Sequence, residues 1–548
     1  MSDLGKSIID IYEKTVAKYG DREAAMDPNT SITWKEYRSR ARWGAMTLLD
    51  ILLPCQEGEA KADVDNLISS YEVGYPIAIF SEKKVELLIS VMSCIYVGAF
   101  YTYINPEQPA ERIAKILSVL NPKLVIVDEE FKEKLEAAGY AGDTIDMYQV
   151  AGGALASDLS GEVSQQTSNL EMSRNQSETA RLDAVVEMIN RDTPLYGVFT
   201  SGSTGTPKCI LINHGAVIDF IGHFSEVFEF DETDVIGNQA PFDFDVSVKD
   251  IYTSIFTGAK MVLIPREYFS TPPILLDYLC DNHVTNLTWA VSALCIISGL
   301  KGFSYRVPTD IRRVMFSGEV MPMKQLALWQ ENVSDARYVN LYGPSEITCN
   351  CTYFQLDRKY DKKEKLPLGQ PFPGRSIYLL DENGQVITEA DKPGEICVTG
   401  ESIAMGYFNN PEQTIKHFVT FVNPEGLEER MYKTGDMAYI ADDGQMYFAG
   451  RKDFQIKHMG HRIELEEIEG GINNMPDVSR SICVYDESRH RISAYYTGDV
   501  DKKTLHLQLK EALPVYMVPN KFIHVSEFIL NKNGKIDRKR LDELEVIE

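Results

Sequence analysis

Short apolar runs alternate with longer amphipathic segments along most of the chain. The short runs, such as 76–80 and 123–127, are dominated by apolar and β-branched residues, which is the pattern of strands buried on both faces. In the longer segments, apolar residues recur at spacings of three and four, as on helices with one buried face. This alternation predicts an α/β fold with parallel, doubly wound sheets.

The predicted strands of this part are 76–80, 99–104, 123–127, 196–199, 235–237, 260–265, 284–289 and 313–316. The predicted helices are two between 8 and 50, then 85–95, 109–120, 214–228 and 246–256. Thr33 is expected to cap the second of the first pair. Two polar segments interrupt the pattern. Segment 55–70 is predicted to be a surface excursion, and 152–184 a solvated linker or loop.

The pattern changes from 367 to 450, where short strands are separated by turns such as Asn383-Gly384 and Asp443-Gly444. Past Arg451 a last unit of mixed helices and strands follows. A chain of 548 residues is too long for one core. We therefore expect a large N-terminal domain, 1–452, of doubly wound sheets plus a β-rich subdomain. A small mobile α+β C-terminal domain, 453–548, would follow it.

Composition narrows the possible partners. The chain carries 55 basic and 81 acidic residues, a net charge of -26, which disfavours nucleic acid and anionic membrane surfaces. An anionic ligand must therefore meet a locally positive pocket. Nine cysteines without a Cys-x-x-Cys pair fit a reducing, cytoplasmic setting. The uncharged stretch 87–104 is divided by Gly98, so a buried helix and strand are expected there and no membrane insertion.

One glycine- and hydroxyl-rich loop directly follows the strand 196–199. Such a backbone can wrap an anion while short donors point inward, as in phosphate-binding loops. Its residues are Thr200, Ser201, Gly202, Ser203, Thr204, Gly205, Thr206, Pro207 and Lys208. It is not a Walker A loop, because no Lys-Ser/Thr pair follows the second glycine. Taken alone, the run could be a flexible surface loop.

Further motifs follow in a fixed order. They are Tyr342–Glu346, Gly406-Tyr407, Asn410–Thr414, Tyr432–Asp436, Gly450–Lys457, Leu513–Pro519 and Asn533–Arg538. Together with 200–208 they resemble the adenylate-forming superfamily, which groups acyl-CoA synthetases, luciferases and the adenylation domains of nonribosomal peptide synthesis. The resemblance spans nearly the whole chain. It implies ATP and Mg²⁺ as cofactors.

The resemblance also implies roles for single residues. Such enzymes join a carboxylate to the α-phosphate of ATP, so the repulsion between two anions must be neutralised. The catalytic group would be Lys535, bridging carboxylate and phosphate, with Glu346 holding Mg²⁺ and Arg451 at the ribose or phosphate. Without the other motifs, Lys535 could be a solvated lysine of a basic tail. The ATP site would comprise the loop residues Thr200 to Gly205, Lys208, Asn340, Leu341, Tyr342, Gly343, Pro344, Ser345, Asp436, Phe448, Arg451 and Lys535.

Asp245 separates the subclasses of this superfamily. In amino-acid-activating members the matching aspartate pairs with the substrate ammonium, since a buried carboxylate is costly without a cation. An ion pair with Lys249, one helical turn on, is the alternative. Matched positions of the substrate pocket are Asp245, Val246, Lys249, Thr288, Met315, Ser317, Leu341, Cys349 and Asn350. This predicts a small, partly polar pocket, in which Lys249 could meet an acidic or amide side chain or fold back on Asp245.

Among subclasses the chain is most similar to the D-alanine:D-alanyl carrier protein ligases, through 244–252, 317–322 and 453–457. It departs from them at Lys249 and Ser317, and in the polar insert. Cys209 also stands where the superfamily usually has glycine, so either the backbone there is ordinary or the loop exit is altered.

No phosphopantetheine attachment motif follows the last unit, so we expect a separate, phosphopantetheinylated carrier protein as acceptor. Asp453 matches the hinge about which the C-terminal domain swings. Gly460 would then face the pantetheine arm, while His458 and His461 could equally be surface residues.

The sequence thus predicts activation of a small amino acid as aminoacyl-AMP, with pyrophosphate release, and its transfer to that carrier. The alternatives are an acyl-CoA synthetase for an amine-free acid and a non-catalytic homologue.

Overall fold

The computed structural model describes residues 5–54, 70–152, 176–202, 206–361, 364–487, 489–530, 536 and 538–547. Its largest sheet has nine strands in the order β15-β14-β13-β12-β11-β9-β10-β1-β2. From β13 to β1 the six neighbouring strands are parallel. The bounds are β1 Glu23–Met26, β2 Ser31–Thr33, β9 Val235–Asn238, β10 Lys260–Leu263, β11 Asn286–Ala290, β12 Arg313–Ser317, β13 Arg337–Tyr342, β14 Thr352–Gln355 and β15 Gln370–Pro371.

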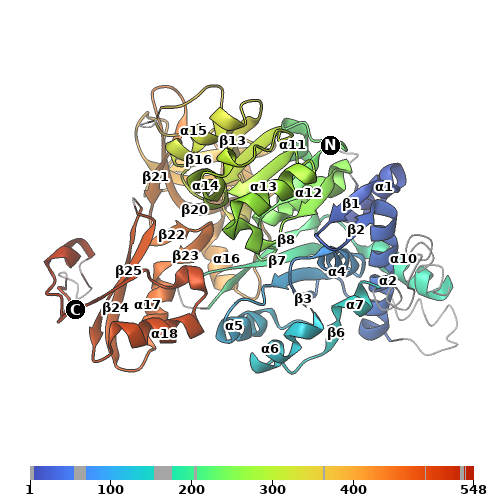
Figure 1. Cartoon of the computed structure of the whole chain (residues 1–548), viewed down its shortest axis with the longest axis horizontal. Coiled ribbons are helices and arrows are strands. Elements are labelled where there is room, and N and C mark those ends of the chain that lie inside the picture. Colours follow the sequence, from blue (N-terminus) through green and yellow to red (C-terminus); the bar gives the residue numbers. More distant parts are fainter. Residues whose placement is uncertain are drawn as a thin grey trace.

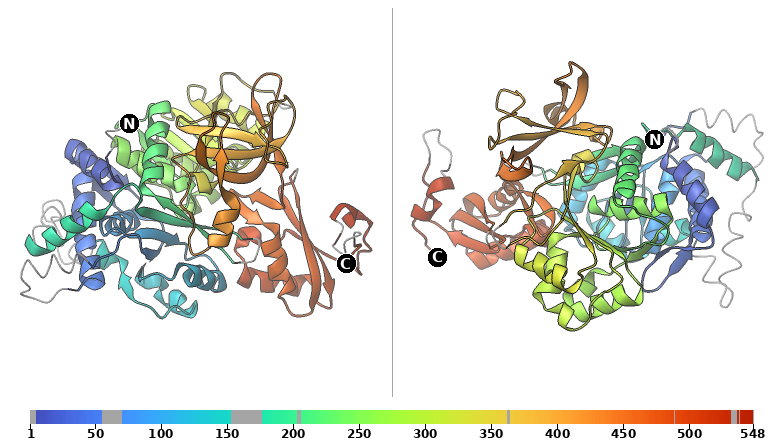
Figure 2. Two further views of the ribbon diagram at one scale, coloured as in Figure 1. Left: turned by 180° about the vertical axis from the view of Figure 1, so that it is seen from behind. Right: turned by 90° about the horizontal axis from the view of Figure 1, so that it is seen from above.

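A second sheet of seven strands follows the order β18-β8-β7-β4-β3-β5-β6. Its bounds are β3 Pro76–Phe80, β4 Phe100–Ile104, β5 Leu124–Val127, β6 Thr144–Asp146, β7 Pro194–Thr200, β8 Lys208–Asn213 and β18 Gly406–Tyr407. Helices lie between and outside the two sheets (Figures 1 and 2). One apolar cluster joins residues of both sheets with residues of α1, α2, α4, α11 and α12. The predicted doubly wound α/β fold is therefore confirmed.

The helices of the large unit mostly match the prediction. They are α1 Ile8–Tyr19, α2 Trp34–Leu52, α4 Val85–Tyr96, α5 Ala110–Leu120, α6 Lys132–Ala137, α7 Met147–Val150, α10 Gln176–Met188, α11 His214–Val227, α12 Val246–Thr257, α13 Pro272–Asp281, α14 Val291–Gly299, α15 Met323–Asn332 and α16 Pro411–His417. Thr33 caps α2 as expected: its hydroxyl accepts from the Glu36 amide, and the Glu36 carboxylate accepts from the Thr33 amide. The uncharged stretch forms the buried helix α4 and strand β4. Among the described helices, none is long and apolar enough to span a membrane.

Helix α10 corrects one prediction. Residues 176–184 were expected in a solvated linker, but they form the first part of this helix, whereas 153–175 lie outside the described residues, as do 55–69. Leu182, Val185 and Ile189 are buried, at the spacing of one helix face. Arg181 donates to the Leu53 carbonyl at 2.6 Å and so ties α10 to the end of α2. The polar composition of the segment concealed this apolar stripe.

The remaining chain forms a β-rich subdomain and a small α+β unit, as predicted. The subdomain contains β16 Arg375–Leu380, β17 Gly394–Gly400, β19 Phe418–Val422, β20 Glu428–Ile440 and β21 Met446–Arg451. The C-terminal unit contains β22 Gln455–His458, β23 His461–Glu464, α17 Leu465–Asn473, β24 Val478–Asp486, β25 Arg491–Gly498, α18 Lys502–Ala512 and β26 Lys521–His524. It packs against one side of the large unit, and the end of the chain lies at its outer edge (Figures 1 and 2). Strand β20 is longer than the predicted 438–440 and includes the motif 432–436.

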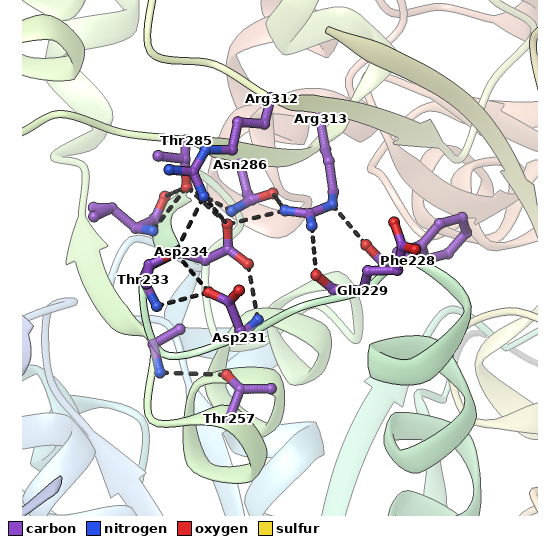
Figure 3. Close-up of polar contacts among 12 residues, drawn as sticks. Phe228, Glu229, Asp231, Thr233, Asp234, Thr257, Thr285, Asn286, Arg312 and Arg313 are labelled. Atoms are coloured by element: carbon purple, nitrogen blue, oxygen red, sulfur yellow. Dashed lines mark hydrogen bonds and ion pairs between the residues drawn. The ribbon is translucent and has the colours of Figure 1, made fainter.

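A buried ionic cluster holds the amino ends of β9, β11 and β12 together (Figure 3). Arg313 donates to the Asp234 carboxylate at 2.9 Å and to the Asn286 side-chain oxygen at 2.8 Å. Its other nitrogens donate to the carbonyls of Phe228 and Glu229, at 2.7 and 2.6 Å. Asp234 is 1% exposed. This cluster lies at the amino ends of the parallel strands, on the opposite side of the sheet from their carboxyl ends.

The cluster predicts a stability effect. We expect Asp234→Ala to lower the free energy of unfolding of the large unit by about 3 kcal/mol, because it leaves the Arg313 guanidinium buried without its charge partner. Denaturant titration followed by the fluorescence of the buried Trp289 and Trp329 measures this change. The matched control is Asp310→Ala, whose partner His283 is 79% exposed. It should cost less than about 1 kcal/mol. Equal losses in both variants would contradict the prediction.

Candidate active site

The carboxyl ends of the parallel strands bring the predicted pocket residues together, as open α/β sheets generally do. Thr288 on β11 pairs with Met315 on β12, and Ser317 at the end of β12 pairs with Ala290. On the next strand Asn340 pairs with Phe316, and Leu341 follows it. All the matched pocket positions from Asp245 to Asn350 are buried. The structure therefore places these residues close together and buried at the carboxyl ends of the strands.

The predicted phosphate loop connects the antiparallel strands β7 and β8. A Cβ on Gly202 would lie 2.2 Å from the Thr206 carbonyl oxygen, so only glycine allows the loop to close back on itself here. Ser203, Thr204 and Gly205 lie outside the described residues. Cys209 is buried within β8 and has an ordinary extended backbone. Of the two alternatives for this position, an ordinary backbone is therefore the one that the structure has.

Glu346 is a buried, ionised carboxylate beside this loop. It is 1% exposed, and it accepts from the Tyr407 hydroxyl at 2.8 Å and from Arg462 at 2.7 Å. Burial alone would raise the pKa of Glu346, but the charges of Arg462 and Lys208 and the Tyr407 hydrogen bond lower it to about 2. A hard anionic oxygen of this kind fits Mg²⁺, and a guanidinium already stands there as the counter-cation. The described residues contain no group of three or more metal-ligating side chains, so a metal here would depend on substrate phosphates and water.

The positions predicted for adenosine form a second polar group. Asp436 on β20 accepts from the Tyr342 hydroxyl at 2.7 Å and from Arg451 at 2.6 Å. Arg451 also contacts both carboxylate oxygens of Asp453, at 2.7 and 2.8 Å. The ammonium of Lys457 lies 5.6 Å from the centre of the Tyr342 ring. Asn340, predicted at the adenine edge, donates to the Pro367 carbonyl at 2.8 Å.

Four basic side chains gather in this part of the site, Lys208, Arg451, Lys457 and Arg462, beside the carboxylates Glu346, Asp436, Asp453 and Glu464. Burial lowers the pKa of the Lys208 and Lys457 ammonium groups, and repulsion from Arg462 opposes the raising effect of the nearby carboxylates. A protein of net charge -26 thus places four cations where an anionic ligand is predicted to bind.

Asp245 lies directly before α12 and is 8% exposed. Burial raises the pKa of its carboxyl, against the opposing effects of a hydrogen bond from Ser345 and the charge of Lys249. None of the ion pairs found among the described residues includes Asp245. Lys249 instead donates to the Asn350 side-chain oxygen at 2.6 Å. The direct Asp245–Lys249 pair considered from the sequence therefore does not form.

The turn after Glu346 completes the pocket wall. Thr348 and Cys349 have positive φ angles of 55° and 71°, which non-glycine residues rarely adopt. This turn places the Cys349 sulfur 3.1 Å from the Asp245 carbonyl oxygen. A Cβ on Gly343 would lie 2.5 Å from the Asn350 Cα, so the glycine permits this close packing. Strained residues of this kind often accompany binding sites.

The C-terminal unit covers the phosphate-loop side of the site. The Ser201 hydroxyl donates to the Arg462 carbonyl at 2.8 Å and accepts from the Glu464 amide at 3.1 Å. The Gly460 amide donates to the Glu319 carboxylate at 3.0 Å, and a Cβ on Gly460 would lie 3.3 Å from Ala290. His458 is buried and His461 stacks on Tyr516 with ring centres 3.6 Å apart, so neither is a free surface residue.

Lys535 lies outside the described residues. The residues flanking it, Leu530 and Ile536, pair with each other. The short segment Arg538–Glu543 that follows lies at the outer edge of the C-terminal unit (Figure 1). The structure therefore brings together the described site residues of the large unit, and Arg538, after Lys535, contacts Glu469 within the C-terminal unit.

An enclosed cavity of about 50 Å³ lies between the two units. It reaches Asp245 and Ser345 from the side of the C-terminal unit. Its polar wall includes Gln108, Arg112, Thr200, Ser201, Asp243, Arg462 and Tyr516. This arrangement leaves a narrow space directly beside the carboxylate predicted to hold the substrate ammonium.

Fold and site together define an adenylate-forming enzyme: a large α/β unit with a phosphate loop, a β-rich subdomain and a small C-terminal unit. A family model described as AMP-binding enzyme matches residues 66–408, and the chain belongs to this family. Tyrocidine synthase 1 of Brevibacillus parabrevis is 27% identical over 98% of this chain. The chain spans only 45% of the length of that relative.

Solved structures confirm the fold. The Vibrio cholerae adenylation domain AlmE, solved with glycyl-adenosine-5'-phosphate, has a TM-score of 0.78 at 19% identity, covering 98% of this chain and 97% of that one. The o-succinylbenzoate CoA synthetase MenE of Bacillus subtilis also has a TM-score of 0.78 at 19% identity, with 98% of each chain covered. One neighbour is an adenylation domain and the other a CoA synthetase, and both are equally similar to this chain. The fold alone therefore does not identify the substrate.

Sequence reasoning missed Arg462, Glu467 and Tyr407 as site residues. Tyr407 belongs to a recognised motif, and its strand β18 pairs with β8 directly beyond the phosphate loop. Arg462 and Glu467 reach the site only because the C-terminal unit docks there. The sequences of β23 and of the start of α17 gave no signal for these contacts.

Proposed function

We propose that this protein activates a small amino acid with Mg·ATP and then transfers it to the phosphopantetheine thiol of a separate carrier protein. The observation that carries the proposal is Asp245, a buried carboxylate at the pocket wall whose ion-pairing capacity is unused among the described residues. The ammonium of an amino acid would supply the missing cation. An amine-free acid would leave this carboxylate unpaired, or protonated.

The first half-reaction forms a bond between a substrate carboxylate oxygen and the α-phosphorus of ATP, and pyrophosphate leaves. Asp245 binds the ammonium and so orients the carboxylate. The loop from Thr200 to Lys208 binds phosphate oxygens, and Arg451 with Asp436 holds the ribose side. A magnesium ion held by Glu346 would neutralise charge on the phosphates. Lys535 would bridge the carboxylate and the α-phosphate from the C-terminal unit.

In the second half-reaction the thiol sulfur attacks the acyl carbon, and AMP leaves with the bond electrons. The arrangement in this structure fits that step, since β23 and the adjoining Gly460 contact Ser201 and Glu319 of the large unit. The cavity beside Asp245 is lined by residues of both units, among them His461, Arg462 and Tyr516 of the C-terminal unit. Rotation about Asp453, the proposed boundary of the two domains, would exchange this arrangement for the one that the first half-reaction requires.

Exchange of labelled pyrophosphate into ATP tests the proposal. The panel comprises D-Ala, L-Ala, Gly, L-Ser, Asp, Glu, Asn and Gln, with fatty and aryl acids beside them. We expect exchange with one or a few small amino acids, and weak or no exchange with amine-free acids. Exchange with amine-free acids alone would assign the protein to the acyl-CoA synthetases.

Lys249 is expected to limit the substrate side chain. It is 1% exposed, burial lowers the pKa of its ammonium, and it fills the space beside Asn350. We expect Lys249→Met to reduce exchange with the native substrate about tenfold or more and to raise it for apolar amino acids, because the charged end is removed from the wall. The same panel measures this shift. Val320→Met, on an exposed surface residue, is the control and should leave the preference unchanged. An unchanged preference in Lys249→Met would exclude this residue from substrate selection.

A further inference from the structure

Two linked motifs, Gly406-Tyr407 and Asn410–Thr414, are not among the predicted ATP and substrate residues. They form strand β18 and the start of helix α16, and β18 pairs with β8, the strand that follows the phosphate loop. The Thr414 hydroxyl accepts from the Tyr407 amide at 2.9 Å and donates to the Asn410 carbonyl at 2.9 Å. A Cβ on Gly406, whose φ is 140°, would lie 2.6 Å from Thr414, so a side chain there would push the helix away from the strand. The two motifs therefore fix the backbone of Tyr407.

The Tyr407 side chain contacts two charged groups of the predicted ATP site and is itself 4% exposed. Its hydroxyl donates to one carboxylate oxygen of Glu346 at 2.8 Å. The Lys208 ammonium lies 5.3 Å from the centre of its ring, within the range of a cation–π contact. Phe418 packs against the same ring, with the two centres 5.6 Å apart. One buried side chain thus contacts both the carboxylate proposed for Mg²⁺ and an ammonium proposed for phosphate.

Glu346 and Lys208 have opposite charges but do not pair with each other. The charge of Lys208 helps to lower the pKa of Glu346, so the two groups lie close enough to interact. Among the ion pairs of the described residues, however, Glu346 pairs with Arg462 and Lys208 with no carboxylate. A direct pair would neutralise both groups, and an incoming ligand would first have to break it. Tyr407 is the side chain that contacts both members of this unformed pair.

We propose that Tyr407 is a positioning residue of adenylate formation, which keeps Glu346 and Lys208 apart and oriented so that one receives Mg²⁺ and the other phosphate. This inference rests on the proposed function. The hydroxyl fixes one oxygen of Glu346 and leaves the other, which Arg462 contacts in this structure, for a ligand. The aromatic face supports the Lys208 ammonium without neutralising it. The two motifs around Tyr407 would then serve to hold this one side chain in place.

Calorimetric titration of the full-length protein with ATP, in the presence and absence of Mg²⁺, tests the inference. Tyr407→Phe keeps the ring and removes only the hydroxyl. We expect it to weaken binding of Mg·ATP about tenfold and to leave binding of metal-free ATP within about twofold, because only the metal ligand loses its orientation. In pyrophosphate exchange the half-saturating Mg²⁺ concentration should rise by the same factor, whereas KM for the amino acid should stay unchanged.

The matched control is Tyr447→Phe. The Tyr447 hydroxyl also donates to a carboxylate, that of Asp443 at 2.9 Å, but this contact is exposed and lies in a hairpin of the β-rich subdomain. The control should change binding of neither Mg·ATP nor metal-free ATP. Tyr407→Leu, which removes the ring as well, should also weaken binding of metal-free ATP, because Lys208 is then free to pair with Glu346.

A double-mutant cycle separates positioning from a general loss of structure. In a Glu346→Gln background, Tyr407→Phe should cause no further loss of Mg·ATP affinity, because the hydroxyl acts through that carboxylate. Thr414→Val removes the acceptor of the Tyr407 amide and remains informative if Tyr407→Phe fails to fold; it should also weaken Mg·ATP binding selectively. The inference would be overturned by unchanged Mg·ATP binding in Tyr407→Phe, by equal weakening with and without Mg²⁺, or by a full additional loss in the Glu346→Gln background.

Failure of this inference is distinguishable from failure of the proposed function. If the unaltered protein exchanges pyrophosphate with no acid in the panel, the proposed function fails, while the metal-dependent difference in ATP binding still decides the role of Tyr407. If the unaltered protein binds no Mg·ATP, both fail.

Discussion

Asp245→Ala is expected to lower kcat/KM for amino-acid-dependent pyrophosphate exchange by about 100-fold or more. Removing one partner of a buried charge pair costs roughly 3 kcal/mol, because the other charge stays desolvated without compensation. Here the stranded charge is the substrate ammonium, in a wall where Lys249 already adds positive charge. The loss should therefore appear mainly as weaker binding of the amino acid.

The control for this prediction is Asp243→Asn. Asp243 lies in the same loop and lines the same cavity, but its carboxylate accepts from Gln108 at 3.1 Å and is not proposed to bind the ammonium. It should retain exchange within about threefold. A small effect of Asp245→Ala, equal to that of the control, would remove the basis of the amino-acid assignment. Gain of exchange with amine-free acids in Asp245→Ala would support it, since the pocket then lacks the unpaired carboxylate.

Much of the fold could be predicted because each local pattern matched its structural period. The apolar run 76–80 is β3, and the uncharged stretch after it separates at Gly98 into α4 and β4. The prediction failed where composition was judged without periodicity, as in α10, whose first half is polar although its Leu182 and Val185 are buried about one turn apart. The long strand β20 was also missed in part, because the polar run Lys433–Asp436, which contains Gly435, interrupts its apolar residues and is typical of a turn.

The site could be predicted only as far as its groups lie in local motifs. The positions on β11 and β12 that the resemblance predicts for the pocket are neighbours by strand register. The contacts of Arg462 with Glu346 and of Glu467 with Gly202 join segments more than 100 residues apart, across two units. No periodicity encodes such contacts. The left-handed pair Thr348–Cys349 likewise has no glycine to mark it.

Lys535→Ala is expected to reduce adenylate formation about 1,000-fold and to leave thiol transfer from a supplied aminoacyl-adenylate nearly unchanged. A cation that bridges two reacting anions acts on the first transition state alone, and removing one such preorganised group costs about 100- to 1,000-fold. Leu530 and Ile536, which flank Lys535, pair with each other, and Arg538 contacts Phe454 and Glu469 within the C-terminal unit.

The two half-reactions measured separately decide this prediction. Pyrophosphate exchange reports the first, and acylation of a phosphopantetheinylated carrier from synthetic adenylate reports the second. Lys532→Ala, in the same basic segment, is the control and should reduce exchange less than about threefold, because a lysine that only contributes surface charge is replaceable. If Lys535→Ala slows both half-reactions equally, the lysine supports the fold of the C-terminal unit and is not the bridging cation. A selective loss of exchange would assign Lys535 to the first half-reaction.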